Sequence, residues 1–186
     1  METFRCFGTG DPLYEAYHDT EWGVPPSSSE DERELFERMS LEAFQSGLAW
    51  ITILRKREAF RAAFAGFDPA AVAAFDDDDV ARLLADAGIV RNRAKIESTI
   101  VNARALRAMH ERGERLADVF ETHRPAPRAR RLTRLDELPA STAESVALAK
   151  ELKRLGFRFV GPTTAYAAMQ ALGYVDDHVA GCVAVR

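Results

Sequence analysis

The stretch LEAFQSGLAWITIL, residues 41–54, holds one carboxylate within an otherwise apolar helical pattern. Glu42 lies near its start, Gln45 follows one helical turn later, and Trp50 comes after a break at Gly47. A charged carboxylate in an apolar wall is costly, so such a residue usually has a partner, a shifted pKa or a function. From this stretch alone, Glu42 is either a functional buried carboxylate or a side chain at the solvent edge of its helix.

The segment leading into this stretch also has a helical pattern. Ser28 or Ser29 is the expected N-cap, acidic residues fill the first turn, and Gly47 lies near the end. The remaining regions with apolar residues at helical spacing are 50–64, 80–87, 92–112, 116–122, 141–155 and 162–173, with a further start at Asp68. A capping box is expected at Ser141 and Glu144. Because no alternation of period two and no internal repeat is present, the sequence predicts an all-α protein.

Composition is that of an ordinary globular protein, with 47% hydrophobic and 29% charged residues among 186. This length predicts a single domain over residues 1–186, possibly of two helical lobes. No apolar run approaches the ~20 residues of a membrane span, and the N-terminus lacks a signal-peptide pattern, so we expect a cytoplasmic protein with no membrane contact. Nothing in the sequence suggests an obligate dimer, and a monomer is expected.

The net charge of −4 conceals an asymmetry along the chain. Residues 1–90 carry 8 Lys and Arg against 18 Asp and Glu, whereas residues 91–158 carry 16 against 9. Such segregation favours a basic face that could bind a polyanion, although both sets could equally be solvated helix surfaces. The overall acidity therefore does not exclude DNA as a partner.

Both cysteines of the chain occur in Cys/His pairs near its two ends. Cys6 and His18 form the first pair, with a loop rich in glycine between them, and His178 and Cys182 form the second with three residues between them. Two cysteines and two histidines complete a tetrahedral zinc shell with no open position, which is typical of a structural metal. The alternative is two buried thiols beside hydrogen-bonded histidines. The aspartates at 176–177 are better placed to support a ligand than to be ligands.

A second feature lies between the last two predicted helices, in GFRFVGP, residues 156–162. Two glycines bracket a tight turn, and Pro162 occupies a position where a missing N–H has no consequence. The amides at the start of the next helix are then available to a phosphate, as in a helix-hairpin-helix that grips a DNA backbone. Most turns of this kind merely connect two helices.

Aromatic residues are dense in DPLYEAYHDTEWGVP, residues 11–25. Together with LEAFQSGLAWITIL, DAGIVRNRAKI, GFRFVGPTTAY and DHVAGC, this segment resembles the 3-methyladenine DNA glycosylase I family. The resemblance is collinear from about Cys6 to Cys182. It implies a helix-hairpin-helix DNA glycosylase fold in which one structural Zn²⁺ per chain joins the N- and C-terminal segments.

The resemblance also implies roles for individual residues. The zinc ligands would be Cys6, His18, His178 and Cys182, as the spacing suggests. Glu42 would be the catalytic carboxylate of a base pocket in which Tyr17 and Trp50 stack on the base and Tyr14 and Trp22 line the walls. Apart from the resemblance, the hairpin predicts that Gly161 and Thr163 contact the DNA backbone, and the basic stretch predicts the same for Arg158 and Lys95. One departure is that the family commonly has a Trp two residues after the first cysteine, where this chain has Phe7 and Gly8; Phe7 is the expected substitute.

The function that follows is base-excision repair of double-stranded DNA containing alkylated bases. The enzyme would flip 3-methyladenine out of the duplex and hydrolyse its glycosidic bond, selecting the base by its positive charge. No lysine in the motifs stands out as a Schiff-base nucleophile, so no strand cleavage is expected. Two other readings are a zinc-containing DNA-binding module without catalysis and a zinc hydrolase with an open coordination position.

Overall fold

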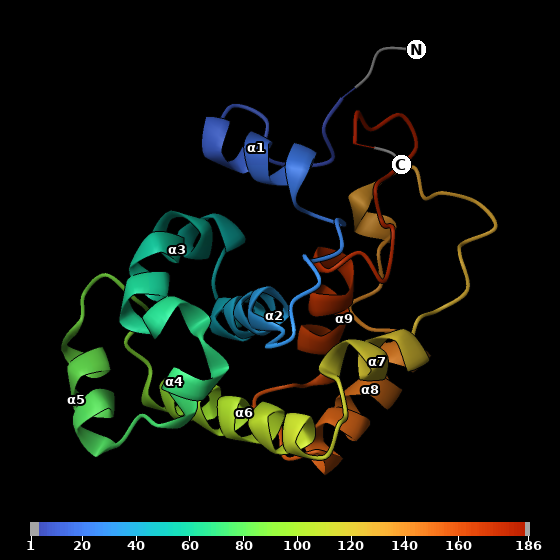
Figure 1. Ribbon diagram of the computed structural model, residues 1–186. Coiled ribbons are helices and arrows are strands. Elements are labelled where there is room, and N and C mark those ends of the chain that lie inside the picture. The colour runs from blue at the N-terminus through green and yellow to red at the C-terminus, as the bar shows by residue number, and fades with distance from the viewer. Residues whose placement is uncertain (1–3, 185–186) are drawn as a thin grey trace.

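The structure is a computed structural model that describes residues 4–184. Every regular element in this range is helical, and its one β contact is an isolated bridge between Phe4 and Cys182. The prediction of an all-α protein is confirmed (Figure 1). The helices are α1 (Pro12–Thr20), α2 (Arg33–Gln45), α3 (Trp50–Ala63), α4 (Pro69–Ala73), α5 (Asp77–Ala85), α6 (Arg93–Glu111), α7 (Leu116–Thr122), α8 (Ala143–Arg154) and α9 (Pro162–Ala171), with short 3-10 turns η1 (Ala65–Phe67) and η2 (Leu135–Glu137).

Helix α1 occupies much of the segment in which the sequence analysis expected only a loop. Asp11 accepts hydrogen bonds from the amides of Leu13 and Tyr14, and Pro12 takes the first helical position. The same Asp-Pro signal, which the analysis used at Asp68, begins α4. The loop between Cys6 and His18 is therefore shorter than predicted, and His18 lies in the last turn of α1.

Helix α2 begins later than predicted, at Arg33 rather than after Ser28 or Ser29. Glu32 has a left-handed φ of 51°, and its buried carboxylate accepts the amides of Leu116 and Ala117, both at 2.8 Å. Glu32 thus caps the start of α7 instead of continuing its own helix. This contact joins residues more than eighty positions apart, so no local signal announces it.

Helix α8 has a capping box, but one residue further along than predicted. Thr142 is the N-cap, its hydroxyl accepts the amide of Ser145, and the Ser145 hydroxyl accepts the amide of Thr142. The expected pair was Ser141 and Glu144. In the observed pair Ser145 takes the place of the usual Glu or Gln, and the helix consequently starts at Ala143.

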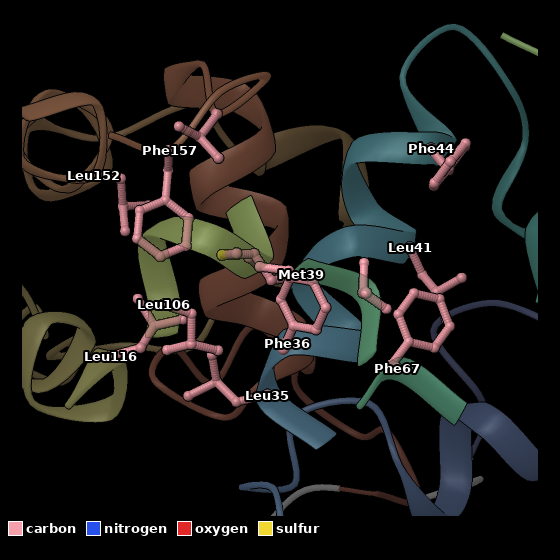
Figure 2. Packing of buried hydrophobic residues seen from close by; sticks show 14 of the residues in the cluster. Leu35, Phe36, Met39, Leu41, Phe44, Phe67, Leu106, Leu116, Leu152 and Phe157 are labelled. Atoms are coloured by element: carbon pink, nitrogen blue, oxygen red, sulfur yellow. The ribbon is translucent and has the colours of Figure 1, made fainter. Parts of the chain in front are cut away.

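Helix α2 is the centre of the fold and packs against α3, α6 and α9 (Figure 1). All ten of its residues from 35 to 44 are buried. Figure 2 shows Leu35 of α2 in one buried cluster with Leu106 of α6 and Leu116 of α7. The Phe36 ring of α2 meets the Phe67 ring of η1 edge-on, with 6.1 Å between centroids. Because the helix is enclosed on every side, its polar residues must find partners inside the protein. Glu42 is one of these enclosed residues.

The two ends of the chain lie side by side (Figure 1). The Phe4 amide donates to the Gly181 carbonyl at 3.3 Å, and the Val183 amide donates to the Phe4 carbonyl at 2.9 Å. This pairing brings the segment before α1 against the segment after α9. Within the described residues, no helix is both long and apolar enough to cross a membrane.

Candidate active site and metal centre

Four metal-ligand side chains meet where the chain ends pair. Cys6 precedes α1, His18 lies in its last turn, and His178 and Cys182 follow α9. One nitrogen or sulfur atom from each residue lies within 4.8 Å of the corresponding atoms of the other three. The structure therefore brings together the two pairs that the sequence analysis singled out.

The distances in this cluster fit a tetrahedral ion. Cys182 Sγ lies 3.3 Å from His18 Nε2 and 3.5 Å from His178 Nδ1, and Cys6 Sγ lies 3.8 Å from His178 Nδ1. Bonds of about 2.3 Å to sulfur and about 2.0 Å to nitrogen place neighbouring ligand atoms roughly 3.5 Å apart in a tetrahedron. Four protein donors fill such a shell, so the donor set suits a structural metal without a site for substrate.

The remaining ring nitrogens of both histidines have partners that fix their orientation. His18 Nδ1 lies 2.8 Å from Asp19 Oδ1, and His178 Nε2 lies 3.3 Å from the carbonyl oxygen of Trp22. Contacts of this kind are typical of metal-binding histidines. Asp176, predicted as such a support, accepts the main-chain amide of His178 at 3.2 Å, whereas Asp177 bonds the Tyr166 hydroxyl at 2.5 Å.

Burial raises the pKa of the Cys6 thiol to about 12. A thiol in such surroundings becomes a thiolate only beside a cation, and a divalent metal supplies that cation. The donor set, the distances and the ring contacts therefore mark a cluster that could hold a metal ion.

The predicted aromatic residues form one cluster against the metal ligands. The Phe7 ring lies 5.1 Å from Tyr14, 6.5 Å from Tyr17 and 4.9 Å from Trp22, measured between centroids. The Trp22 ring also meets His178 edge-on at 4.6 Å. Phe7 thus takes a place in the aromatic wall, and the wall rests directly on the metal centre.

Tyr17 and Trp50 face the inner end of this cluster. Their centroids are 5.2 Å apart and their planes are inclined by 42°. A base held between two rings needs a separation of about 7 Å, which is twice an ordinary carbon–carbon contact. The two rings instead contact each other, so a base that meets both would lie against them from one side.

Glu42 is 6% exposed and lies close to both tyrosines of α1. Burial raises the pKa of its carboxyl to about 8, the nearby Arg38 guanidinium opposes that rise, and Glu21 adds to it. Burial, followed by the charge of Glu42, also raises the pKa values of Tyr14 and Tyr17. The prediction that Glu42 is a buried carboxylate with a shifted pKa agrees with this geometry, and the solvent-edge alternative is excluded.

The sequence analysis missed a network of buried charges behind Glu42. Arg57 donates to Glu37 at 2.7 Å and to both oxygens of Glu21, at 2.7 and 2.6 Å. Arg38, one turn before Glu42, donates to the carbonyls of Glu21, Val24 and Ala171. The sequence of α2 carried a signal for this network. Charged residues occur on every face of the helix, including the face with its row of apolar residues, so some of the charged side chains must be buried.

The fold encloses the Glu42 side chain, which is 6% exposed. Cavities of about 340 and 230 Å³ lie elsewhere, the larger between residues 124–131 and the ends of α8 and α9, and neither is lined by Glu42. The Trp50 indole N–H is buried without a hydrogen-bond partner among the described residues. Leaving a buried donor without a partner costs roughly 1–3 kcal/mol. The unpaired indole N–H and the buried Glu42 carboxyl therefore identify the candidate site, and cavity volume does not.

The predicted hairpin joins α8 to α9 and presents several polar groups. Gly161 is the N-cap of α9 and brings no capping side chain, Pro162 takes the first position, and Thr163 is exposed beside it. Arg158 is exposed in the hairpin itself. The amides at the start of α9 therefore have no side-chain cap, which agrees with the predicted phosphate contact.

Lys95 does not have the surface position that the sequence analysis gave it. It is 7% exposed, and its ammonium donates to the carbonyls of Phe44 at 2.8 Å and Ser46 at 2.6 Å. Lys95 therefore satisfies carbonyl groups at the end of α2, beneath the loop that leads to Trp50. The ammonium is thus engaged in tertiary hydrogen bonds, and a contact of Lys95 with the DNA backbone stays a prediction.

Comparisons with known proteins bear on the family to which the chain is similar. The sequence model of the methyladenine glycosylase family matches residues 7–185. DNA-3-methyladenine glycosylase 1 of Escherichia coli (strain K12) is 52% identical over 182 residues, which cover 96% of this chain and 95% of that protein. A crystal structure of 3-methyladenine DNA glycosylase I superposes with a TM-score of 0.91 at 50% identity, covering 98% of this chain and 100% of that one. A Staphylococcus aureus structure, described as the structural basis of 3-methyladenine recognition, has a TM-score of 0.85 and 33% identity, with 96% and 94% coverage.

Proposed function

The chain belongs to the methyladenine glycosylase family, and on that premise we propose that it hydrolyses the N-glycosidic bond of 3-methyladenine in alkylated DNA. The observation that carries the proposal is Glu42, a carboxyl buried beside Tyr14 and Tyr17 in an aromatic cluster. The bond between the base and its deoxyribose breaks, the hydroxyl of a water molecule bonds to the sugar carbon, and the proton of that water is released. The base leaves as neutral 3-methyladenine, and the DNA strand keeps an abasic site.

Charge is the basis of selection in this pocket. Adenine methylated at N3 is cationic while it is attached to the sugar, whereas normal adenine is neutral. Without a cation, burial holds the pKa of Glu42 near 8, so the carboxyl is mainly protonated at neutral pH. A cationic base lowers that pKa and pairs with the carboxylate in a charge-assisted contact. A neutral adenine offers no such compensation for the cost of leaving the duplex.

The aromatic rings contribute in the same direction. Electron-rich faces of Tyr17 and Trp50 attract a cation by about 2 kcal/mol when water is excluded. The Trp50 indole N–H, unpaired among the described residues, is available to an acceptor on a bound base. Lys95 is engaged with two carbonyls and is no candidate for a Schiff base, which supports base removal without strand cleavage.

We further propose that Cys6, His18, His178 and Cys182 hold one structural Zn²⁺ per chain. The bound ion would join the chain ends and brace the aromatic wall, because Phe7 follows Cys6 directly and Trp22 packs on His178. We also infer that the chain acts as a single domain, which the one buried cluster extending from α2 to α9 supports.

The test is release of free bases from methylated duplex DNA, resolved by chromatography. We expect release of 3-methyladenine by the wild type and a loss of at least about tenfold in Glu42→Gln, the scale of one hydrogen bond to a charged group. The control is Glu58→Gln, an exposed carboxylate of α3, which should leave release unchanged. Equal release by Glu42→Gln would show that base release does not depend on the Glu42 carboxylate. No release by a folded, zinc-loaded wild type would favour a DNA-binding module without catalysis.

A further inference from the structure

Phe159 combines two unfavourable features in the hairpin between α8 and α9. Its φ of 58° lies in the left-handed region, which suits glycine and disfavours a bulky side chain. Its ring is also 38% exposed, although it is large and apolar. A glycine at this position would remove both features, so the ring is kept at a cost to the hairpin itself.

The hairpin around Phe159 is firmly held. Phe157 and Val160 on either side are each 2% exposed and belong to the main hydrophobic cluster. Asn102, a buried residue of α6, accepts the Arg158 amide at 2.7 Å and donates to the Arg158 carbonyl at 3.1 Å. These contacts hold the main chain on one side of Phe159 by two hydrogen bonds. The ring is therefore presented from a rigid support and not from a loose loop.

Phe159 also lies close to the segment that follows Glu42. The Lys95 ammonium is 5.7 Å from the centroid of the Phe159 ring, and the same ammonium bonds the carbonyls of Phe44 and Ser46. One buried cation thus connects the hairpin to the end of α2, where the loop to Trp50 begins.

We propose that the Phe159 ring makes an apolar contact with the sugar and base edges of damaged duplex DNA. The proposal rests on the proposed function, which supplies the duplex. Exposed Arg158 and Thr163, together with the amides at the start of α9, offer groups for phosphates on the same hairpin. An aromatic face among them suits the apolar surfaces that are uncovered when a nucleotide leaves the stack.

The experiment compares Phe159→Leu, which keeps an apolar side chain, with Phe159→Tyr, which keeps the aromatic face. The probe is a short duplex that contains one stable abasic-site analogue, and affinity is measured at several salt concentrations. We expect Phe159→Tyr to bind like the wild type and Phe159→Leu to bind at least about fivefold more weakly, the lower end for loss of an aromatic contact. The control is Val146→Ala. Val146 is also an exposed apolar residue, but it lies on α8, and its replacement should leave the affinity for the duplex unchanged.

The salt dependence separates a direct contact from collapse of the hairpin. An apolar contact releases no counterions, so Phe159→Leu should keep the wild-type slope of log affinity against log salt, whereas Arg158→Ala should make it shallower by about one. A wild-type affinity in Phe159→Leu would overturn the proposal and leave the ring as a cover for Lys95. A reduced slope in Phe159→Leu would overturn it as well, because phosphate contacts would then have been lost.

Failure of the proposed glycosylase activity can be distinguished from failure of the proposed Phe159 contact. A wild type that binds the duplex but releases no base would refute the glycosylase activity, while the comparison of Leu with Tyr would still test the contact. Binding of free 3-methyladenine gives a second check, because it should be equal in both variants and the wild type.

Discussion

Replacing Glu42 by Gln should stabilise the protein, and the gain should grow with pH. The carboxyl has an ordinary pKa of 4.5 and a pKa of about 8 in the fold, chiefly because it is buried. Between these values the folded chain keeps a proton that the unfolded chain releases. The wild type therefore loses stability as pH rises through this interval, by about 1.4 kcal/mol per pH unit and on the order of 5 kcal/mol in total. A glutamine does not titrate and avoids that loss.

The assay is urea unfolding of both proteins from about pH 5 to about pH 9, with the difference in unfolding free energy plotted against pH. The difference should rise across the interval and level off above pH 8, where the wild-type carboxyl is ionised in both states. Glu37→Gln is the matched control on the same helix. Glu37 is equally buried, but it bonds Arg57 at 2.7 Å and Arg61 at 2.9 Å. Its replacement should destabilise the fold by about 3 kcal/mol. A difference between wild type and Glu42→Gln that does not change with pH would refute the reasoning, since Glu42 would then ionise as it does in water.

Two further predictions concern the supports of the site. Lys95→Met leaves two carbonyls at the end of α2 without their donor, so it should cost about 3 kcal/mol and lower the thermal midpoint by roughly 6–12 °C, whereas the exposed Lys150→Met should shift it by less than about 2 °C. An unchanged midpoint in Lys95→Met would mean that the ammonium does not support α2. Asp19→Asn weakens the contact that orients the His18 ring. It should lower zinc affinity by about 10- to 100-fold, measured in competition with a chromophoric chelator. An unchanged affinity would mean that other contacts orient His18.

Several features of the site were predictable because their signals are local or chemical. The Cys/His pairs needed only residue types and short spacings, and the structure brings all four side chains together. Glu42 stood out because a carboxylate in an apolar helical run is costly wherever the helix packs. The Asp-Pro signal at residues 11–12 was equally clear, and applying it there would have predicted α1.

Other features depended on contacts between distant segments. Lys95 looked like a surface cation in a basic stretch, yet it bonds carbonyls about fifty positions earlier in the chain. The basic stretch as a whole is less available than its composition suggests, because Arg128 pairs with Asp177 and Arg131 with Asp176. Charge counted along a sequence does not record which side chains neutralise one another in space.

The sequence by itself determined the all-α class and most helix positions, and it singled out the Cys/His set that could hold a metal and the carboxylate of Glu42. These follow from hydrophobic periodicity, from caps made within three or four residues and from donor chemistry, all of which act over a few neighbouring bonds. Only the tertiary structure decided that α2 is enclosed on all sides, that Arg38 and Arg57 form charged contacts behind Glu42, and that the Phe159 ring stands beside Lys95. Such partners lie far apart in the chain, and packing around a shared core selects them.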